Sequence, residues 1–156
     1  MQRWLWLSAL VVVLDQLSKW LAQHYLQLHQ PVPVTPMFNL TLMYNPGAAF
    51  SFLSNAGGWQ RWFFTVLAIG VSIVLTVWLK RLPPGERGQA VGLSLIIGGA
   101  IGNLIDRLLL GHVVDFIQVY YDIYYWPAFN LADSAITVGA VLLIALSFRS
   151  ERTEKT

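Results

Sequence analysis

The sequence predicts an all-α membrane protein with four transmembrane helices and a small outer β-sheet, organised as one domain over residues 1–156. Apolar residues make up 56% of the chain, charged residues only 12%, and the mean hydropathy is +0.55. A soluble domain carries about 25% charged residues, so this chain is too apolar to be one. In addition, four apolar stretches approach the roughly 20 residues that are needed to cross a bilayer.

These stretches cover residues 4–25, 62–79, 90–110 and 131–148. The linkers between them differ in charge: the second contains Lys80, Arg81 and Arg87, whereas the third has no Lys or Arg between Gly111 and Asn130. Positively charged linkers remain on the cytoplasmic side of a membrane. We therefore expect the second linker and both termini to be cytoplasmic, and the first and third linkers to lie at the outer face.

The outer linkers show the alternation of a β-strand. Apolar side chains recur at every second position from Phe38 to Tyr44, and Asn45-Pro46-Gly47 then predicts a turn before a second short run. We expect outer β elements at about 35–55 and 112–120. Such a sheet could hold an extended peptide through main-chain hydrogen bonds. The alternative is an apolar loop that rests on the lipid headgroups.

The third apolar stretch ends in a polar cluster of Asn103, Asp106 and Arg107. Asn103 is three residues from Asp106 and four from Arg107, so it shares a helix face with each of them. With a rise of about 1.5 Å per residue, Asp106 lies roughly 24 Å along the helix from residue 90, in the outer third of the membrane. That depth is level with Asp133, at the outer start of the fourth stretch. Arg107 needs an acceptor there, either a substrate carbonyl or a charge network that ties the helices together.

Asp115 and Asp133 flank the third linker in a chain that has few acids. A carboxylate is costly to hold near hydrocarbon, so acids at this depth suggest a functional site. If the two face each other, their like charges separate their pKa values, and one stays protonated while the other acts as a base. This division of roles suits hydrolysis of an amide by water.

Other residues restrict the alternatives. Asp15 and Lys19 are four residues apart on one helix face, and we interpret them as an ion pair that packs helices together. The chain has no cysteine, which excludes a thiolate nucleophile, and its basic residues are too scattered for a nucleic-acid surface. Asp115, Asp133 and a nearby asparagine could bind a divalent cation, with His112 as a further ligand, although such a cation usually takes more oxygen ligands than two carboxylates.

Two further classes of protein remain open at this point. A small transporter or proton channel could use the polar residues of the first and third stretches as a pathway. However, the inner halves of the last three stretches are almost wholly apolar. A non-catalytic membrane scaffold would not explain acids that gather at one depth.

Five motifs together resemble the bacterial lipoprotein signal peptidase family, also called signal peptidase II. They occur in order along nearly the whole chain: Asp15-Gln16-Leu17-Ser18-Lys19, Asn45-Pro46-Gly47-Ala48-Ala49-Phe50-Ser51, Gly102-Asn103-Leu104-Ile105-Asp106-Arg107, Val113-Val114-Asp115-Phe116 and Phe129-Asn130-Leu131-Ala132-Asp133.

The resemblance implies an intramembrane aspartic endopeptidase of the bacterial cytoplasmic (inner) membrane. It implies that the enzyme cleaves diacylglyceryl-modified prolipoproteins immediately before the lipidated cysteine, with Asp115 and Asp133 as its catalytic dyad at the outer face. It further implies a monomer that contacts membrane lipid, is inhibited by globomycin-type cyclic peptides, and needs no metal or cofactor. Residues that the resemblance assigns to substrate binding or support are Asp15, Lys19, Asn45, Gly47, Asn103, Asp106, Arg107, Asn130 and Ala132.

Overall fold

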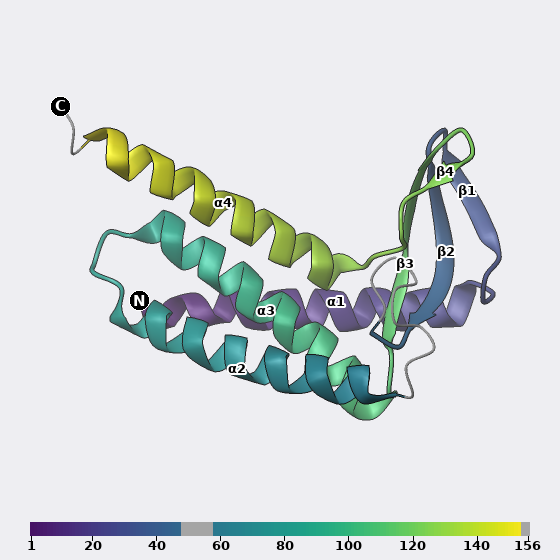
Figure 1. Ribbon diagram of the computed structural model, residues 1–156, viewed down its shortest axis with the longest axis horizontal. Coiled ribbons are helices and arrows are strands. Elements are labelled where there is room, and N and C mark those ends of the chain that lie inside the picture. The colour runs from purple at the N-terminus through teal and green to yellow at the C-terminus, as the bar shows by residue number, and fades with distance from the viewer. Residues whose placement is uncertain (48–57, 154–156) are drawn as a thin grey trace.

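Four long helices and a small antiparallel sheet make up the computed structural model (Figure 1), which describes residues 1–47 and 58–153, the last five by their backbone alone. A short 3-10 helix, η1, precedes the first long helix. Each of the four long helices contains a stretch that is long and apolar enough to cross a membrane. The bounds are Gln2–Trp4 for η1, Leu5–Tyr25 for α1, Trp59–Arg81 for α2, Arg87–Leu109 for α3 and Leu131–Thr153 for α4.

Two helices begin three residues before the predicted stretches. Helix α2 starts at Trp59 and α3 at Arg87, whereas the apolar runs begin at 62 and 90. Arg61 and Arg87 interrupt the apolar pattern but not the helices, because a long basic side chain near a helix end can reach the polar surface. The start of α2 is set by Gly58, whose φ of +84° is a left-handed conformation that favours glycine.

The sheet stands across one end of the bundle (Figure 1) and has the strand order β1-β2-β3-β4. Its strands are Pro31–Thr35 for β1, Phe38–Asn45 for β2, Val113–Tyr121 for β3 and Tyr124–Tyr125 for β4. The four helices and the small sheet confirm the predicted fold class. Strand β1 begins before the predicted span of about 35–55. The prediction missed it because its two prolines obscure the alternation of side chains that is typical of a strand. The predicted run after the Asn45-Pro46-Gly47 turn lies outside the described residues.

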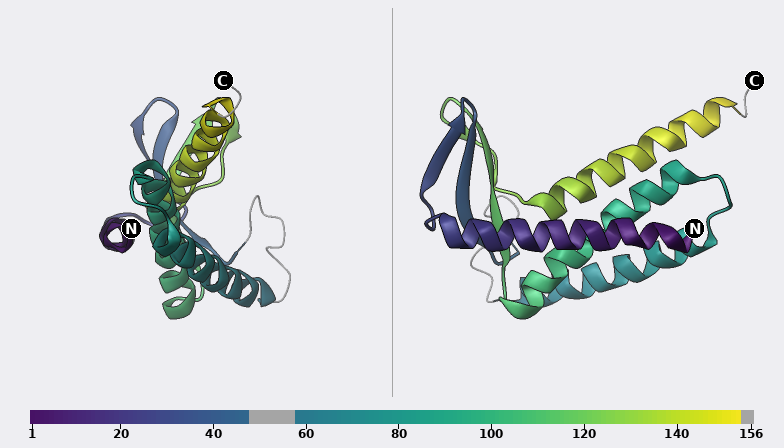
Figure 2. Two further views of the ribbon diagram at one scale, coloured as in Figure 1. Left: turned by 90° about the vertical axis from the view of Figure 1, so that its left-hand side faces the viewer. Right: turned by 180° about the vertical axis from the view of Figure 1, so that it is seen from behind.

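Helix α3 is the centre of the bundle, packing against α1, α2 and α4 (Figure 2, left). Glycines permit this close approach. A Cβ atom on Gly98 would lie 2.8 Å from the backbone oxygen of Ser8 in α1, and a Cβ on Gly99 would overlap the carbonyl oxygen of Ala132 in α4. The backbone of α4 is therefore set against α3 at the residue that precedes Asp133.

Two buried apolar clusters lie at opposite ends of the bundle. One joins α2 and α3 near the turn between them, and the other lies between the end of α1 and the sheet. They contain Leu79, Leu82, Ala90, Leu93 and Ile97 in the first, and Ala22, Leu42 and Val114 in the second.

A glycine substitution tests the close contact between α3 and α4. We expect Gly99→Ala to destabilise the protein by about 1–3 kcal/mol, because the added methyl group must push the two backbones apart. Gly70→Ala is the matched control, since a Cβ at Gly70 meets nothing within 4 Å. The control should be neutral or should stabilise the helix by about 0.5–1 kcal/mol. Equal thermal unfolding of the two variants in detergent would show that the contact does not restrict packing.

Candidate active site

Asn130 links the two aspartates that the sequence singled out. Asp115 is the third residue of β3, with 2% of its surface exposed, and Asp133 lies in the first turn of α4. The Asn130 side chain donates through Nδ2 to Oδ1 of Asp115 at 2.7 Å and accepts the backbone N–H of Asp133 at 2.9 Å. Its own backbone N–H donates to Oδ2 of Asp133 at 3.3 Å. This reciprocal pair is a helix capping box, so the start of α4 itself brings the two carboxyl groups to one residue.

Two further asparagines donate to the same carboxyl groups from other elements. Asn45, at the end of β2, donates to Oδ2 of Asp115 at 3.2 Å. Asn103, in α3, donates to Oδ1 of Asp133 at 2.7 Å, and its own oxygen accepts a hydrogen bond from Asn130 at 3.1 Å. Each aspartate is therefore oriented by neutral amides from two different parts of the chain.

A buried ion cluster lies next to these amides. The Nζ atom of Lys19 is 2.8 Å from Oδ2 of Asp15 and 2.9 Å from Oδ2 of Asp106. It also donates to Oδ1 of Asn103 at 2.9 Å, and only 2% of the lysine is exposed. The ion pair predicted within α1 is present, and Asp106 of α3 extends it into a three-residue cluster that joins two helices.

The two carboxylates of the cluster also hold the residues that precede the paired acids. Oδ1 of Asp15 accepts the backbone N–H of Ala132 at 2.9 Å, and Oδ2 of Asp106 accepts that of Val114 at 3.0 Å. Ala132 and Val114 stand immediately before the aspartates of α4 and β3 in the sequence. The cluster therefore fixes the backbone on both sides of the site.

The environment of Asp115 favours its protonated form. Burial and, to a smaller degree, the negative charge of Asp133 raise the pKa of this carboxyl group to about 7. Hydrogen bonds from Asn45 and Asn130 and the positive charge of Lys19 act in the opposite direction but do not cancel the effect. Near neutral pH the site can thus supply both a proton donor and a proton acceptor.

Arg107 and Gly47 lie at the α2 side of the site. Arg107 donates through Nη1 to the backbone oxygen of Asn103 at 3.2 Å, and its guanidinium carbon is 5.4 Å from the centroid of the Phe64 ring. Its buried Nε has no hydrogen-bond partner among the described residues. Gly47 has a φ of +112°, and a Cβ there would be 3.0 Å from the same phenylalanine ring. Glycine is therefore required at this position, and Arg107 keeps one donor unused.

Two supporting residues were not predicted from the sequence. Gln16 donates through Nε2 to Oδ1 of Asp106 at 2.8 Å. Arg61, near the start of α2, donates to the backbone oxygens of Arg107 at 2.8 Å and Leu108 at 3.2 Å, and so caps the negative end of α3. Gln16 lies within the Asp15-Gln16-Leu17-Ser18-Lys19 motif, but it is uncharged, so its residue type did not indicate a role. Arg61 was the sole Lys or Arg of the first linker, which was its only signal.

The described residues contain no group of three or more His, Cys, Asp or Glu that could hold a metal ion. His112, the residue considered as a third ligand, packs its ring against Tyr44 with the centroids 4.3 Å apart. The buried charged residues of the described chain are Asp15, Lys19, Asp106 and Asp115, all near the sheet. They do not form a charged path through the bundle.

Comparison with known proteins identifies the family. The chain matches the family model of signal peptidase (SPase) II over residues 7–149. The chain belongs to the signal peptidase II family. It is 58% identical over 152 residues to the lipoprotein signal peptidase of Pseudomonas aeruginosa, covering 96% of this chain and 90% of that protein. It is 57% identical over 149 residues to the one of Acinetobacter baumannii, covering 96% and 85%.

Solved structures agree with this assignment. One is a bacterial membrane enzyme determined by the in meso method at 2.3 Å resolution. It superposes with a TM-score of 0.85 at 31% identity, covering 100% of this chain and 93% of that one. A second, at 1.9 Å resolution, gives a TM-score of 0.79 at 33% identity and covers 94% and 92%. As a signal peptidase II, the protein is a multi-pass membrane peptidase and therefore a hydrolase.

Removing the buried cation tests the ion cluster. We expect Lys19→Met to destabilise the protein by about 3–5 kcal/mol, because the variant leaves two buried carboxylates without their partner. Lys80→Met removes the same charge from an exposed position on α2 and should change stability by no more than about 0.5 kcal/mol. Thermal unfolding in detergent measures both variants. A Lys19→Met protein as stable as the control would show that the cluster does not hold the helices together.

Proposed function

We propose that this signal peptidase II is an aspartic endopeptidase that cleaves diacylglyceryl-modified prolipoproteins immediately before the lipidated cysteine. The name of its relatives, lipoprotein signal peptidase, supports the substrate class. The observation that carries the mechanism is the shared contact of Asn130 with Asp115 and Asp133. Two carboxyl groups linked in this way fit the paired-acid arrangement of aspartic proteases, and the raised pKa of Asp115 agrees with it.

In the proposed reaction, Asp133 takes a proton from water while the water oxygen attacks the carbonyl carbon of the scissile bond. The proton of Asp115 passes to the carbonyl oxygen, which gives a tetrahedral diol. Asp133 then gives its new proton to the amide nitrogen while Asp115 takes a proton back from a hydroxyl group of the diol, and the C–N bond breaks so that the amine leaves. The raised pKa of Asp115 supports its role as the resting acid. Because the two acids interact, the proton belongs to the pair and the roles can exchange during turnover.

A donor for the developing oxyanion lies beside the pair. Arg107 has an unused Nε–H, and its guanidinium is held over the ring of Phe64. A cation held in place before the reaction stabilises charge that appears only in the transition state.

Met43 lies opposite Asp115 in the β2–β3 register, and cross-strand partners share a face of the sheet. This apolar neighbour of Asp115 supports the proposal that the substrate backbone lies along the sheet, next to that acid.

The arrangement of charge supports an active site at the outer face of the cytoplasmic membrane. Arg3, Lys80, Arg81 and Arg87 lie at the end of the bundle opposite the sheet, and positive residues stay on the cytoplasmic side. Helices α2 and α4 pack on different sides of α3 (Figure 2, left), and their outward faces carry exposed apolar side chains. We place the signal helix and the acyl chains of the substrate in the lipid beside these faces.

Conservative substitution of the acids tests the mechanism. We expect Asp115→Asn and Asp133→Asn each to lower cleavage of a lipid-modified precursor by at least about 100-fold, since each removes a group that must transfer a proton. Asp122→Asn is the matched control, because Asp122 is an exposed acid in the turn between β3 and β4. It should cleave at the wild-type rate in liposomes. A folded dyad variant that keeps wild-type turnover would exclude the mechanism.

The pH dependence gives a second test. A carboxyl group that must be protonated loses its proton as the pH rises through its pKa, so the single-turnover rate should fall above about pH 7. In Asp133→Asn the pKa of Asp115 should fall because the like charge is gone, yet stay above its usual value because burial is the larger cause. Infrared spectroscopy of the carboxyl band follows this titration. A rate that stays constant from pH 6 to 9 would contradict the assignment.

A further inference from the structure

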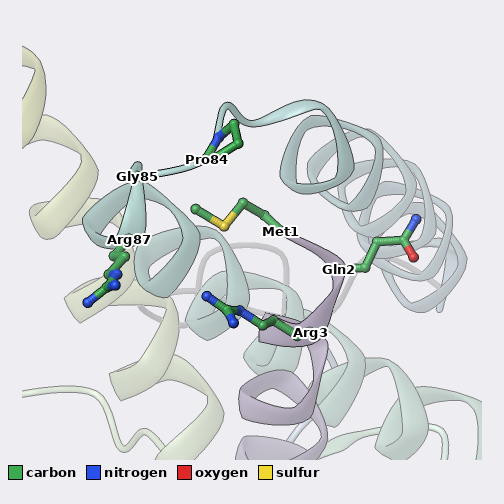
Figure 3. Close-up of a pocket in the computed structure, with 6 residues that line it drawn as sticks. All are labelled: Met1, Gln2, Arg3, Pro84, Gly85 and Arg87. Atoms are coloured by element: carbon green, nitrogen blue, oxygen red, sulfur yellow. The ribbon is translucent and has the colours of Figure 1, made fainter.

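A cavity of about 510 Å³ lies at the end of the bundle opposite the sheet (Figure 3). It is formed by the start of the chain and by the turn that joins α2 to α3, which are far apart in the sequence. The cavity plays no part in the proposed peptidase reaction. Its lining residues are Met1, Gln2, Arg3, Pro84, Gly85 and Arg87.

Packing fixes the walls of this cavity. Met1 and Trp4 pack against the buried cluster that includes Leu79 and Leu82 at the end of α2. Gly85 has a φ of +110°, which bends the opposite wall sharply into the start of α3. The first wall packs on the core, and the second lies between the buried residues Leu82 and Ala90, so binding needs to order mainly the exposed side chains that line the cavity.

The cavity carries positive charge that the described residues do not neutralise. Arg3 extends toward the start of α3, where Arg87 lies (Figure 3). Neither side chain makes an ion pair or a hydrogen bond with a described residue. Glu86 precedes α3 but its side chain does not cap the helix, and the first turn contains no acid. The positive end of the helix dipole therefore adds to the charge of the two arginines.

We propose that this cavity binds a phosphate-bearing anion. Guanidinium groups pair with phosphate through two parallel hydrogen bonds, and a helix N-terminus supplies further donors to the same kind of ligand. The phosphate can belong to the headgroup of an anionic phospholipid or be free in solution. Trp6 of α1 and Trp78 of α2 are exposed near the same end, as aromatic residues are at a membrane interface, which favours the lipid.

The test measures binding and needs no peptidase assay. The full-length protein in an uncharged detergent is heated with increasing short-chain phosphatidylglycerol, short-chain phosphatidylcholine or inorganic phosphate, at constant ionic strength. A ligand that binds the folded state raises the unfolding temperature in a saturable way. We expect phosphatidylglycerol to do so, and Arg3→Gln/Arg87→Gln to raise its half-saturating concentration at least about tenfold, because two charge-assisted contacts are lost.

Two variants separate a specific site from general attraction. Lys80→Gln/Arg81→Gln removes the same charge from the same end of the bundle but does not alter the cavity lining, so its half-saturation should stay within about twofold of wild type. Arg3→Lys/Arg87→Lys keeps the charge but not the paired hydrogen bonds, so its half-saturating concentration should lie between those of wild type and the glutamine variant. A wild-type unfolding temperature without ligand shows that the glutamine variant is folded.

Each remaining outcome decides the proposal. If inorganic phosphate gives the same arginine-dependent saturation at equal concentration, the site stands and its ligand is soluble phosphate. If no anion gives saturable stabilisation, or if Lys80→Gln/Arg81→Gln weakens binding as much as the cavity variant, the site does not exist. Because cleavage is not measured, neither result bears on the proposed peptidase mechanism.

Discussion

The geometry of the site depends on one buried cation, the ammonium group of Lys19. Removing this charge from water costs several kcal/mol, which the carboxylates of Asp15 and Asp106 offset at 2.8 and 2.9 Å. Each carboxylate also accepts a backbone N–H, that of Ala132 at Oδ1 of Asp15 and that of Val114 at Oδ2 of Asp106. An interaction that first appears to join helices therefore also sets where α4 and β3 begin, and with them the two acids of the site.

The acids of the ion cluster and the paired acids of the site have different surroundings. Asp15 and Asp106 contact a cation directly, whereas Asp115 receives hydrogen bonds from the neutral amides of Asn45 and Asn130. An amide orients a carboxyl group without adding a positive charge beside it. The burial cost of Asp115 is then only partly compensated, and its pKa rises toward neutrality. Separating the cation from the paired acids by one layer of asparagines is what lets a charged cluster support a proton-transfer site.

Sequence reasoning found the features that hydropathy and charge encode. It predicted the four apolar stretches, and it singled out Asp115 and Asp133 because acids are rare in such a chain. It missed β1, whose prolines obscure its pattern, and the register shift between Leu40 and Met43 that sets which residue lies opposite Asp115. It also missed Arg61, because a helix C-terminus capped from another helix leaves no local signal. Contacts between distant residues are set by packing, which no short pattern records.

The two ends of α3 differ in whether their charged side chains are paired within the protein. At the sheet end, charges are buried and paired within the protein, whereas at the other end Arg3 and Arg87 face a cavity without a described partner. A helix of 23 residues is about 35 Å long, close to the thickness of a bilayer core. An anion bound at the arginines therefore cannot contact the paired acids. Its effect would be to hold one end of α3 at the headgroups, which fixes the depth of the site at the other end.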